Sequence, residues 1–276
     1  MSREADAAPR RIVVALDASP ASLSALAAGV ELASRVRAEV FGVFVEDLNL
    51  VRLGRLAFAP HVGLPSGERG ELDEAWVEAQ LRSLAGRARD ALREALEKTR
   101  VPGQLRVVRG SVTREVLAAA DAGDLLILGC ASRPLTSRPR LGRTARAAVE
   151  QAAGPVLLLP EGARLGRPVL VVYDAAGEEA LDAAIRLAER ALLVLASGAS
   201  AEEAARRGRD AAAKLAERGL ASRVRAVPDD DVARALRSER KGLVVVGLAS
   251  PLLRASGLAA LLEDATPVLV ARRAAA

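Results

Sequence analysis

The chain has 276 residues, of which 51% are hydrophobic and only 2% are aromatic. This length favours two domains of ordinary size, and their cores must be packed mainly from Ala, Val and Leu. The formal net charge is +5, but the basic residues are spread along the whole chain and aromatic side chains for base stacking are scarce. The composition therefore argues against a nucleic-acid partner.

Three further features restrict the function. No apolar run approaches the roughly 18 residues of a transmembrane helix, and the polar start MSREADAAPRR lacks the apolar core of a signal peptide. The single cysteine, Cys130, excludes a disulfide framework. We therefore expect a cytoplasmic protein without a membrane partner. His61 is the only histidine, so neither a zinc site nor a Ser-His-Asp triad is expected.

In the first half, apolar segments alternate with segments of helical periodicity. Strands are predicted near 11–17, 39–46, 104–109, 124–129 and 155–159. Helices are predicted near 19–37, 72–100, 112–122 and 142–153. The first helix has the clearest start, because Ser19 suits the N-cap and Pro20 the first helical position. Near-continuous apolar strands indicate a parallel sheet that is covered on both faces.

Most of the extra length of the first half lies in an inserted loop, 46–75. The insertion is rich in Gly and Pro and contains Phe58, and Trp76 follows just beyond it. A loop this long is usually functional or disordered. Its Leu and Phe side chains fit two interpretations, a partner or lid surface and a segment folded over its own sheet.

The second half repeats the first in shorter form. PVLVVYD ends in Asp174 as RIVVALD ends in Asp17, and the closing ATPVLV matches the earlier AGPVLL. Strands are predicted near 168–173, 191–196, 221–227, 243–247 and 267–271. We therefore expect tandem α/β domains, 1–160 and 167–276, with a short linker between them. Each aspartate ends a strand, which suits either a binding site or a cap on the next helix.

Gly129 and Gly142 suggest an anion site. The first ends a predicted buried strand and the second opens a predicted helix, so backbone N–H groups and the helix dipole would point into one phosphate-sized nest. The loop between and beside them is rich in arginine, which suits either anion steering or a solvated basic surface. Cys130 is either a reactive thiol or inert packing.

These features together resemble the universal stress protein family in its tandem two-domain form. The resemblance rests on the Asp-ended first strand with its Ser-Pro-x-Ser helix start, the Phe-Val-Glu-Asp end of the second strand, the glycine loop and the Gly/Thr-Pro-Val-Leu closing strand. It covers nearly the whole chain. It implies two tandem five-stranded parallel-sheet α/β sandwiches, of the adenine nucleotide α-hydrolase type, paired through their fifth strands as an internal pseudo-dimer. A further homodimer is left open.

Part of this family binds ATP through a Gly-x2-Gly-x9-Gly-Ser/Thr loop. The resemblance maps the first and third glycines onto Gly129 and Gly142, with the family's spacing. Ser132 replaces the middle glycine, which is needed where backbone approaches phosphate closely. Arg143 replaces the Ser/Thr, and Thr144 lies one residue further on. Arg143 can contact a phosphate or occupy the space that a triphosphate needs.

The resemblance also assigns Asp17 to the adenine- and ribose-facing position and Val45 to the base contact. The matching loop of the second half, 247–257, is too short and apolar to wrap a triphosphate. The resemblance thus implies a non-enzymatic stress-response or regulatory protein with an unidentified protein partner and at most one ATP site, in the first half. The alternative is a scaffold of the same fold that binds no nucleotide. An enzyme is disfavoured, because Asp-Ala-Ser-Pro stands where a Ser-Gly-Gly phosphate loop is needed.

Overall fold

The computed structural model describes residues 9–53, 60–62, 69–71, 74–130, 141–187, 191–239, 241–253, 258, 261–262 and 265–272. In the first half the strands of the main sheet are β1 (Arg11–Leu16), β2 (Glu39–Asp47), β5 (Gly103–Gly110), β6 (Leu125–Cys130) and β7 (Val156–Pro160). The helices that cover them are α1 (Pro20–Val36), α3 (Glu74–Thr99), α4 (Val112–Ala118) and α5 (Arg143–Gln151). Every strand and helix predicted for this half is present.

The second half has the same order of elements. Its strands are β8 (Val169–Tyr173), β9 (Ala191–Gly198), β10 (Ala221–Pro228), β11 (Leu243–Gly247) and β12 (Val268–Ala271). Its helices are α6 (Gly177–Leu187), α7 (Ala201–Glu217) and α8 (Val232–Ser238), with short 3-10 turns at Asp229–Asp231 and Pro251–Leu253.

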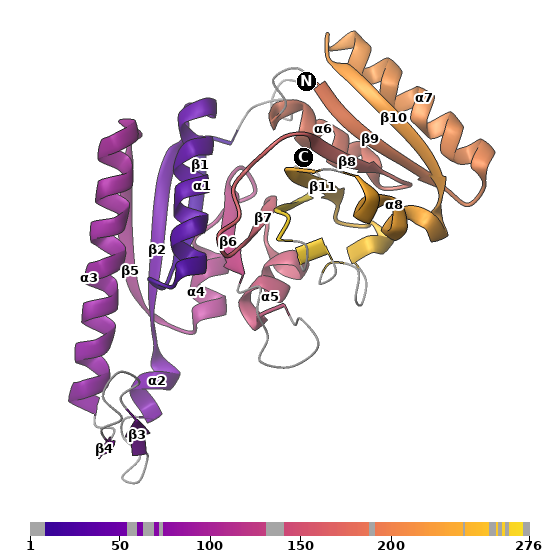
Figure 1. Ribbon diagram of the computed structural model, residues 1–276. Helices are drawn as coiled ribbons and strands as arrows, with labels where there is room; N and C mark the ends of the chain where they lie inside the picture. The colour runs from indigo at the N-terminus through magenta and orange to yellow at the C-terminus, as the bar shows by residue number, and fades with distance from the viewer. Residues whose placement is uncertain are drawn as a thin grey trace.

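The strands of both halves form a single ten-stranded sheet in the order β10-β9-β8-β11-β12-β7-β6-β1-β2-β5 (Figure 1). All neighbours within a half are parallel. The halves join through antiparallel β7 and β12, where Val156 pairs with Val270 and Leu158 with Val268. This pairing of the fifth strand of each half confirms the predicted internal pseudo-dimer.

Each face of the sheet carries one continuous apolar core that runs through both halves. Side chains from α1, α3, α6 and α7 pack on one face. Side chains from α4, α5 and α8 pack on the other, together with Leu258, Leu261 and Leu262. Arg272, just after β12, adds a polar link between the halves, since its Nη2 donates to the carbonyl oxygens of Ala148 (3.1 Å) and Val149 near the end of α5. A cation at that end of a helix is favourably placed.

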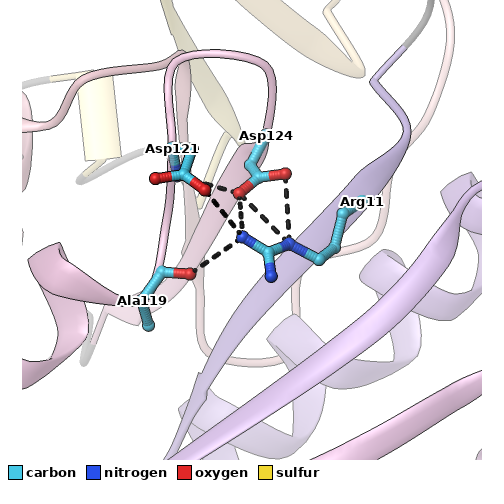
Figure 2. Close-up of polar contacts among 4 residues, drawn as sticks. All are labelled: Arg11, Ala119, Asp121 and Asp124. Carbon is cyan, nitrogen blue, oxygen red and sulfur yellow. Dashed lines mark hydrogen bonds and ion pairs between the residues drawn. The ribbon is translucent and has the colours of Figure 1, made fainter.

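Arg11 fixes β1 to the turn before β6, at the amino edge of the sheet (Figure 2). Its Nη2 donates to Asp124 Oδ2 at 2.6 Å and its Nε lies 3.2 Å from each carboxylate oxygen of Asp124. The same Nη2 reaches the Ala119 carbonyl and the Asp121 carboxylate, each at 3.3 Å. The hydrogen bond to Asp124 raises the pKa of Arg11. This cluster lies at the edge opposite to the glycines of the predicted site.

The inserted segment contains regular structure that the sequence did not predict. It forms α2 (Leu48–Leu53) and a hairpin of β3 (Pro60–Val62) and β4 (Arg69–Glu71), next to the start of α3 (Figure 1). Val51 of α2 is buried with Val77 and Leu81 of α3. The segment is therefore partly folded against its neighbour, while Phe58 falls outside the described residues. Among the residues described, no helix has the length and apolar character to span a membrane.

Candidate functional site

A cleft of about 480 Å³ opens at the carboxyl ends of β1, β2 and β6. In an open parallel sheet, ligands bind at such ends where the strand order reverses, as it does between β1 and β6. Six residues predicted from the sequence line this cleft together: Asp17, Val45, Gly129, Gly142, Arg143 and Thr144. Ser132 lies outside the described residues, as do Arg133, Arg138 and Arg140.

Asp17 shapes the turn that leads into α1. Its Oδ1 accepts the Ser19 N–H at 2.9 Å, and its own N–H donates to Ser22 Oγ at 3.3 Å. Partial burial acts to raise the pKa of Asp17, but the hydrogen bonds from Ser19 and Ser22 outweigh it and the net shift is downward. The carboxylate is therefore ionised at neutral pH. Asp17 therefore caps the turn while presenting a negative charge to the cleft.

Gly129 is required by packing. A Cβ built on it would lie 2.3 Å from the carbonyl oxygen of Ala21 and 2.7 Å from the Ser22 nitrogen. The second half has the same contact, because a Cβ on Gly247 would lie 2.3 Å from the carbonyl oxygen of Ala176. Both glycines allow the end of a central strand to touch the backbone at the start of a helix. Gly129 therefore serves the fold, whether or not a ligand is present.

Gly142 differs from Gly129, since no packing with the described residues requires it. It is the N-cap of α5 with φ −57°, and a Cβ there would meet none of the described residues within 4 Å. The first N–H groups of a helix have no intrahelical acceptor and favour an anion. The exposed Arg143 adds a full positive charge at the same end of the cleft. The Thr144 hydroxyl lies 3.1 Å from the Thr113 hydroxyl of α4 and has a partner within the protein.

Much of the cleft wall is apolar, and two of its residues, Leu84 and Leu262, were not predicted to lie at the site. Leu50 comes from the insertion and Leu84 from α3, and they stand near Val45 of β2. Leu262 reaches the cleft from the second half. The sequence predicted a helix near 72–100 but not its place at the cleft, because a stripe of leucines looks the same whether it faces a core or a cleft.

The first half of the chain shows to which protein family it belongs. Residues 9–160 match the model of the universal stress protein family. The chain belongs to this family. A universal stress protein from Methanocaldococcus jannaschii is 25% identical over 152 residues, which cover 54% of this chain and 81% of the relative.

Two solved structures match over both halves of this universal stress protein. One is a universal stress protein from Archaeoglobus fulgidus, with a TM-score of 0.72 and 14% identity, covering 96% of this chain and 99% of the other. The second is a functionally unknown protein from Pseudomonas aeruginosa PAO1, with a TM-score of 0.55 and 16% identity, covering 96% and 92%. At these identities the likeness concerns the fold, and it extends to the tandem arrangement.

Cys130 lies in the cleft of this universal stress protein without the properties of a nucleophile. It is half-buried, and burial raises the pKa of its thiol from 9.0 to about 12. A thiol with that pKa is almost entirely protonated at neutral pH and reacts slowly. Among the residues described, no cluster of His, Cys, Asp and Glu is suited to hold a metal ion.

The second half of this universal stress protein closes the corresponding edge with its own polar groups. Asp174, the counterpart of Asp17, is only 8% exposed. Its Oδ2 accepts the Ser250 hydroxyl and its Oδ1 accepts the Ala176 N–H at 2.8 Å. Ser250 Oγ also accepts the Leu252 N–H at 3.3 Å. The aspartate that faces a cleft in the first half is thus engaged within the protein in the second.

Proposed function

We propose that this chain is a non-enzymatic stress-response protein that binds one adenine nucleotide in its first half, with ATP as the first candidate. The proposal rests on one observation. A carboxylate, an apolar strand wall and a helix N-terminus that has no side-chain cap among the described residues all line one cleft. Its volume of about 480 Å³ lies within the range of small-molecule sites, roughly 300–1,000 Å³.

Each part of the cleft suits one part of a nucleotide. The ionised Asp17 accepts hydrogen bonds from ribose hydroxyls or the adenine amino group. Val45 and the neighbouring leucines pack against the base. The N–H groups at the start of α5 and the guanidinium of Arg143 bind phosphate. None of the described residues lies within 4 Å of a Cβ built on Gly142, and this supports the assignment because those residues leave room for a phosphate to approach the backbone.

Specific contacts also favour the alternative, a scaffold that binds no nucleotide. Asp17 Oδ1 already holds the turn before α1, and Thr144 already pairs with Thr113. Gly129 is explained by packing alone. In this second candidate, the residues that resemble a nucleotide site only stabilise the fold, and the protein acts through a surface that binds a protein partner.

A thermal titration separates the two candidates. ATP, ADP and AMP are added with and without Mg²⁺, and the unfolding midpoint is followed. A ligand at a hundred times its Kd stabilises the native state by about 2.7 kcal/mol, which raises the midpoint by roughly 5 °C or more. The variants are Asp17→Ala and Arg143→Ala, with Arg146→Ala as the matched control because Arg146 lies on the same helix outside the cleft.

The expected result is a midpoint shift that Asp17→Ala and Arg143→Ala reduce and Arg146→Ala preserves. Each variant is compared with its own unliganded midpoint, because Asp17→Ala also loses a cap. If millimolar ATP leaves the midpoint of the unmodified protein unchanged, the nucleotide proposal fails and the scaffold is favoured. A shift that all three variants retain places the nucleotide elsewhere.

A further inference from the structure

A second cavity lies between the two halves, at the edge of the sheet opposite to the cleft. Its volume is about 310 Å³, and it shares no lining residue with the cleft. The walls come from the last turns of two helices, with Leu32 of α1 and Leu187 of α6, and from the joined strands, with Leu157 of β7 and Leu269 of β12. The segment between β7 and β8 adds Leu165. The interior is thus built of leucine from both halves.

The junction of the halves explains why this space exists. The core on this face is covered by α1 in the first half and by α6 in the second (Figure 1). The antiparallel pair β7–β12 lies between these helices, so its leucines face a strip where the two halves meet. Leu165 is half-buried against the same core. The cavity therefore spans the pseudo-dimer interface, a common place for ligand sites.

Two cations lie at the rim of this apolar space. Arg35, at the end of α1, and Arg167, beside β8, both line the cavity and are both exposed. Arg35 pairs with Glu31 one turn earlier on the same helix, and both side chains are nearly half exposed. Such exposed pairs contribute little and exchange readily for another anion. The rim therefore favours a negatively charged group above an apolar interior.

We infer that this cavity binds a single-chain amphiphile with one carboxylate, its chain among the leucines and its head group at Arg35 and Arg167. An apolar cavity of about 150 Å³ takes up benzene, so a space of twice that volume accommodates on the order of a dozen carbon atoms. The ligand contacts both halves at once and strengthens their association. This inference is independent of the proposed nucleotide site.

Calorimetric titration of the full chain with dodecanoate, below its micelle concentration, tests the inference. One equivalent is expected to bind. Dodecyltrimethylammonium, which has the same chain and the opposite charge, is expected to bind at least tenfold more weakly. The double variant Arg35→Gln/Arg167→Gln is expected to lower dodecanoate affinity about tenfold and to reduce the preference over the cation.

Two tryptophan substitutions test where the alkyl chain of the amphiphile binds. Leu165→Trp fills the cavity from its half-buried rim and is expected to abolish binding. Leu50→Trp makes the same change in the nucleotide cleft, at a side chain that is 47% exposed, and is expected to leave binding intact. If Leu165→Trp does not fold by circular dichroism, Leu187→Trp at the end of α6 replaces it.

Several outcomes overturn the inference. They are no heat of binding, binding that survives a folded Leu165→Trp or Leu187→Trp, loss of binding in Leu50→Trp alone, and equal affinity for the two amphiphiles. ATP titration of the same variants reports on the nucleotide cleft and not on this cavity. Failure of the amphiphile inference is therefore distinguishable from failure of the proposed function.

Discussion

Replacement of Gly129 by alanine is expected to destabilise the protein by about 3 kcal/mol. The added methyl group would lie 2.3 Å from the Ala21 carbonyl oxygen and 2.4 Å from its carbonyl carbon, well inside van der Waals contact. These are backbone atoms of the first turn of α1, so no side chain can rotate out of the way. Relief requires β6 and α1 to separate by about an ångström, which places the cost near the upper end of that for overpacked cores.

Urea denaturation followed by circular dichroism measures this cost, and two glycine variants calibrate it. Gly247→Ala has one such conflict, 2.3 Å from the Ala176 carbonyl oxygen, and is also expected to be costly. Gly142→Ala meets none of the described residues within 4 Å at a φ of −57°, so its effect is expected to stay within about 1 kcal/mol. A Gly129→Ala protein as stable as Gly142→Ala, with Gly247→Ala costly, would refute the packing argument and make phosphate contact the better reason for Gly129.

Three other predictions concern ionisable groups. Cys130 is expected to react with a disulfide reagent at pH 8 about a thousandfold more slowly in the native than in the unfolded protein, because its pKa is raised from 9.0 to about 12. Arg11→Met is expected to lower the free energy of unfolding by about 2 kcal/mol in urea denaturation, since it leaves Asp124 buried without its cation. The loss is smaller than for a fully buried ion pair because the Arg11 side chain is 31% exposed. Asp17 has a lowered pKa, so the stability it contributes is present above its unfolded value of 3.8 and lost as the pH falls through the folded one. Asp17→Asn is therefore expected to make the thermal midpoint fall less steeply as the pH drops below 3.8, and an unchanged pH dependence contradicts the capping role.

The sequence predicted the architecture well because the central strands β1, β6, β7, β8, β11 and β12 are rich in Val, Leu and Ile. Such runs are typical of buried parallel strands, and the repeat of the Asp-ended first strand and the closing strand fixed the tandem order. Pairing of the fifth strands came from the family resemblance, and Val156–Leu158 do pair antiparallel with β12. The folded part of the insertion escaped prediction, since α2 has only six residues and depends on burial of Val51 against α3.

The candidate site was predicted less completely. Asp17, Val45 and Gly142 were expected to lie together, and they line one cleft. Leu84 and Leu262 were not expected there. Their places depend on how α3 and the second half pack against the sheet, and no local pattern encodes that packing.

The residues that set a binding half apart from a non-binding half must be ones that the two halves do not share. An aspartate after the first strand and a glycine near the end of the fourth occur in both halves, where each serves the same turn and the same close contact. Neither residue can therefore distinguish a binding half from a non-binding one. The differences lie in Ser250, which engages Asp174 in the second half, and in Arg143 and the insertion of the first. Under the proposed function, ligand selectivity is therefore expected to depend on Arg143 and Leu50. Variants at these residues are expected to change which nucleotide shifts the midpoint while leaving the unliganded midpoint nearly unchanged.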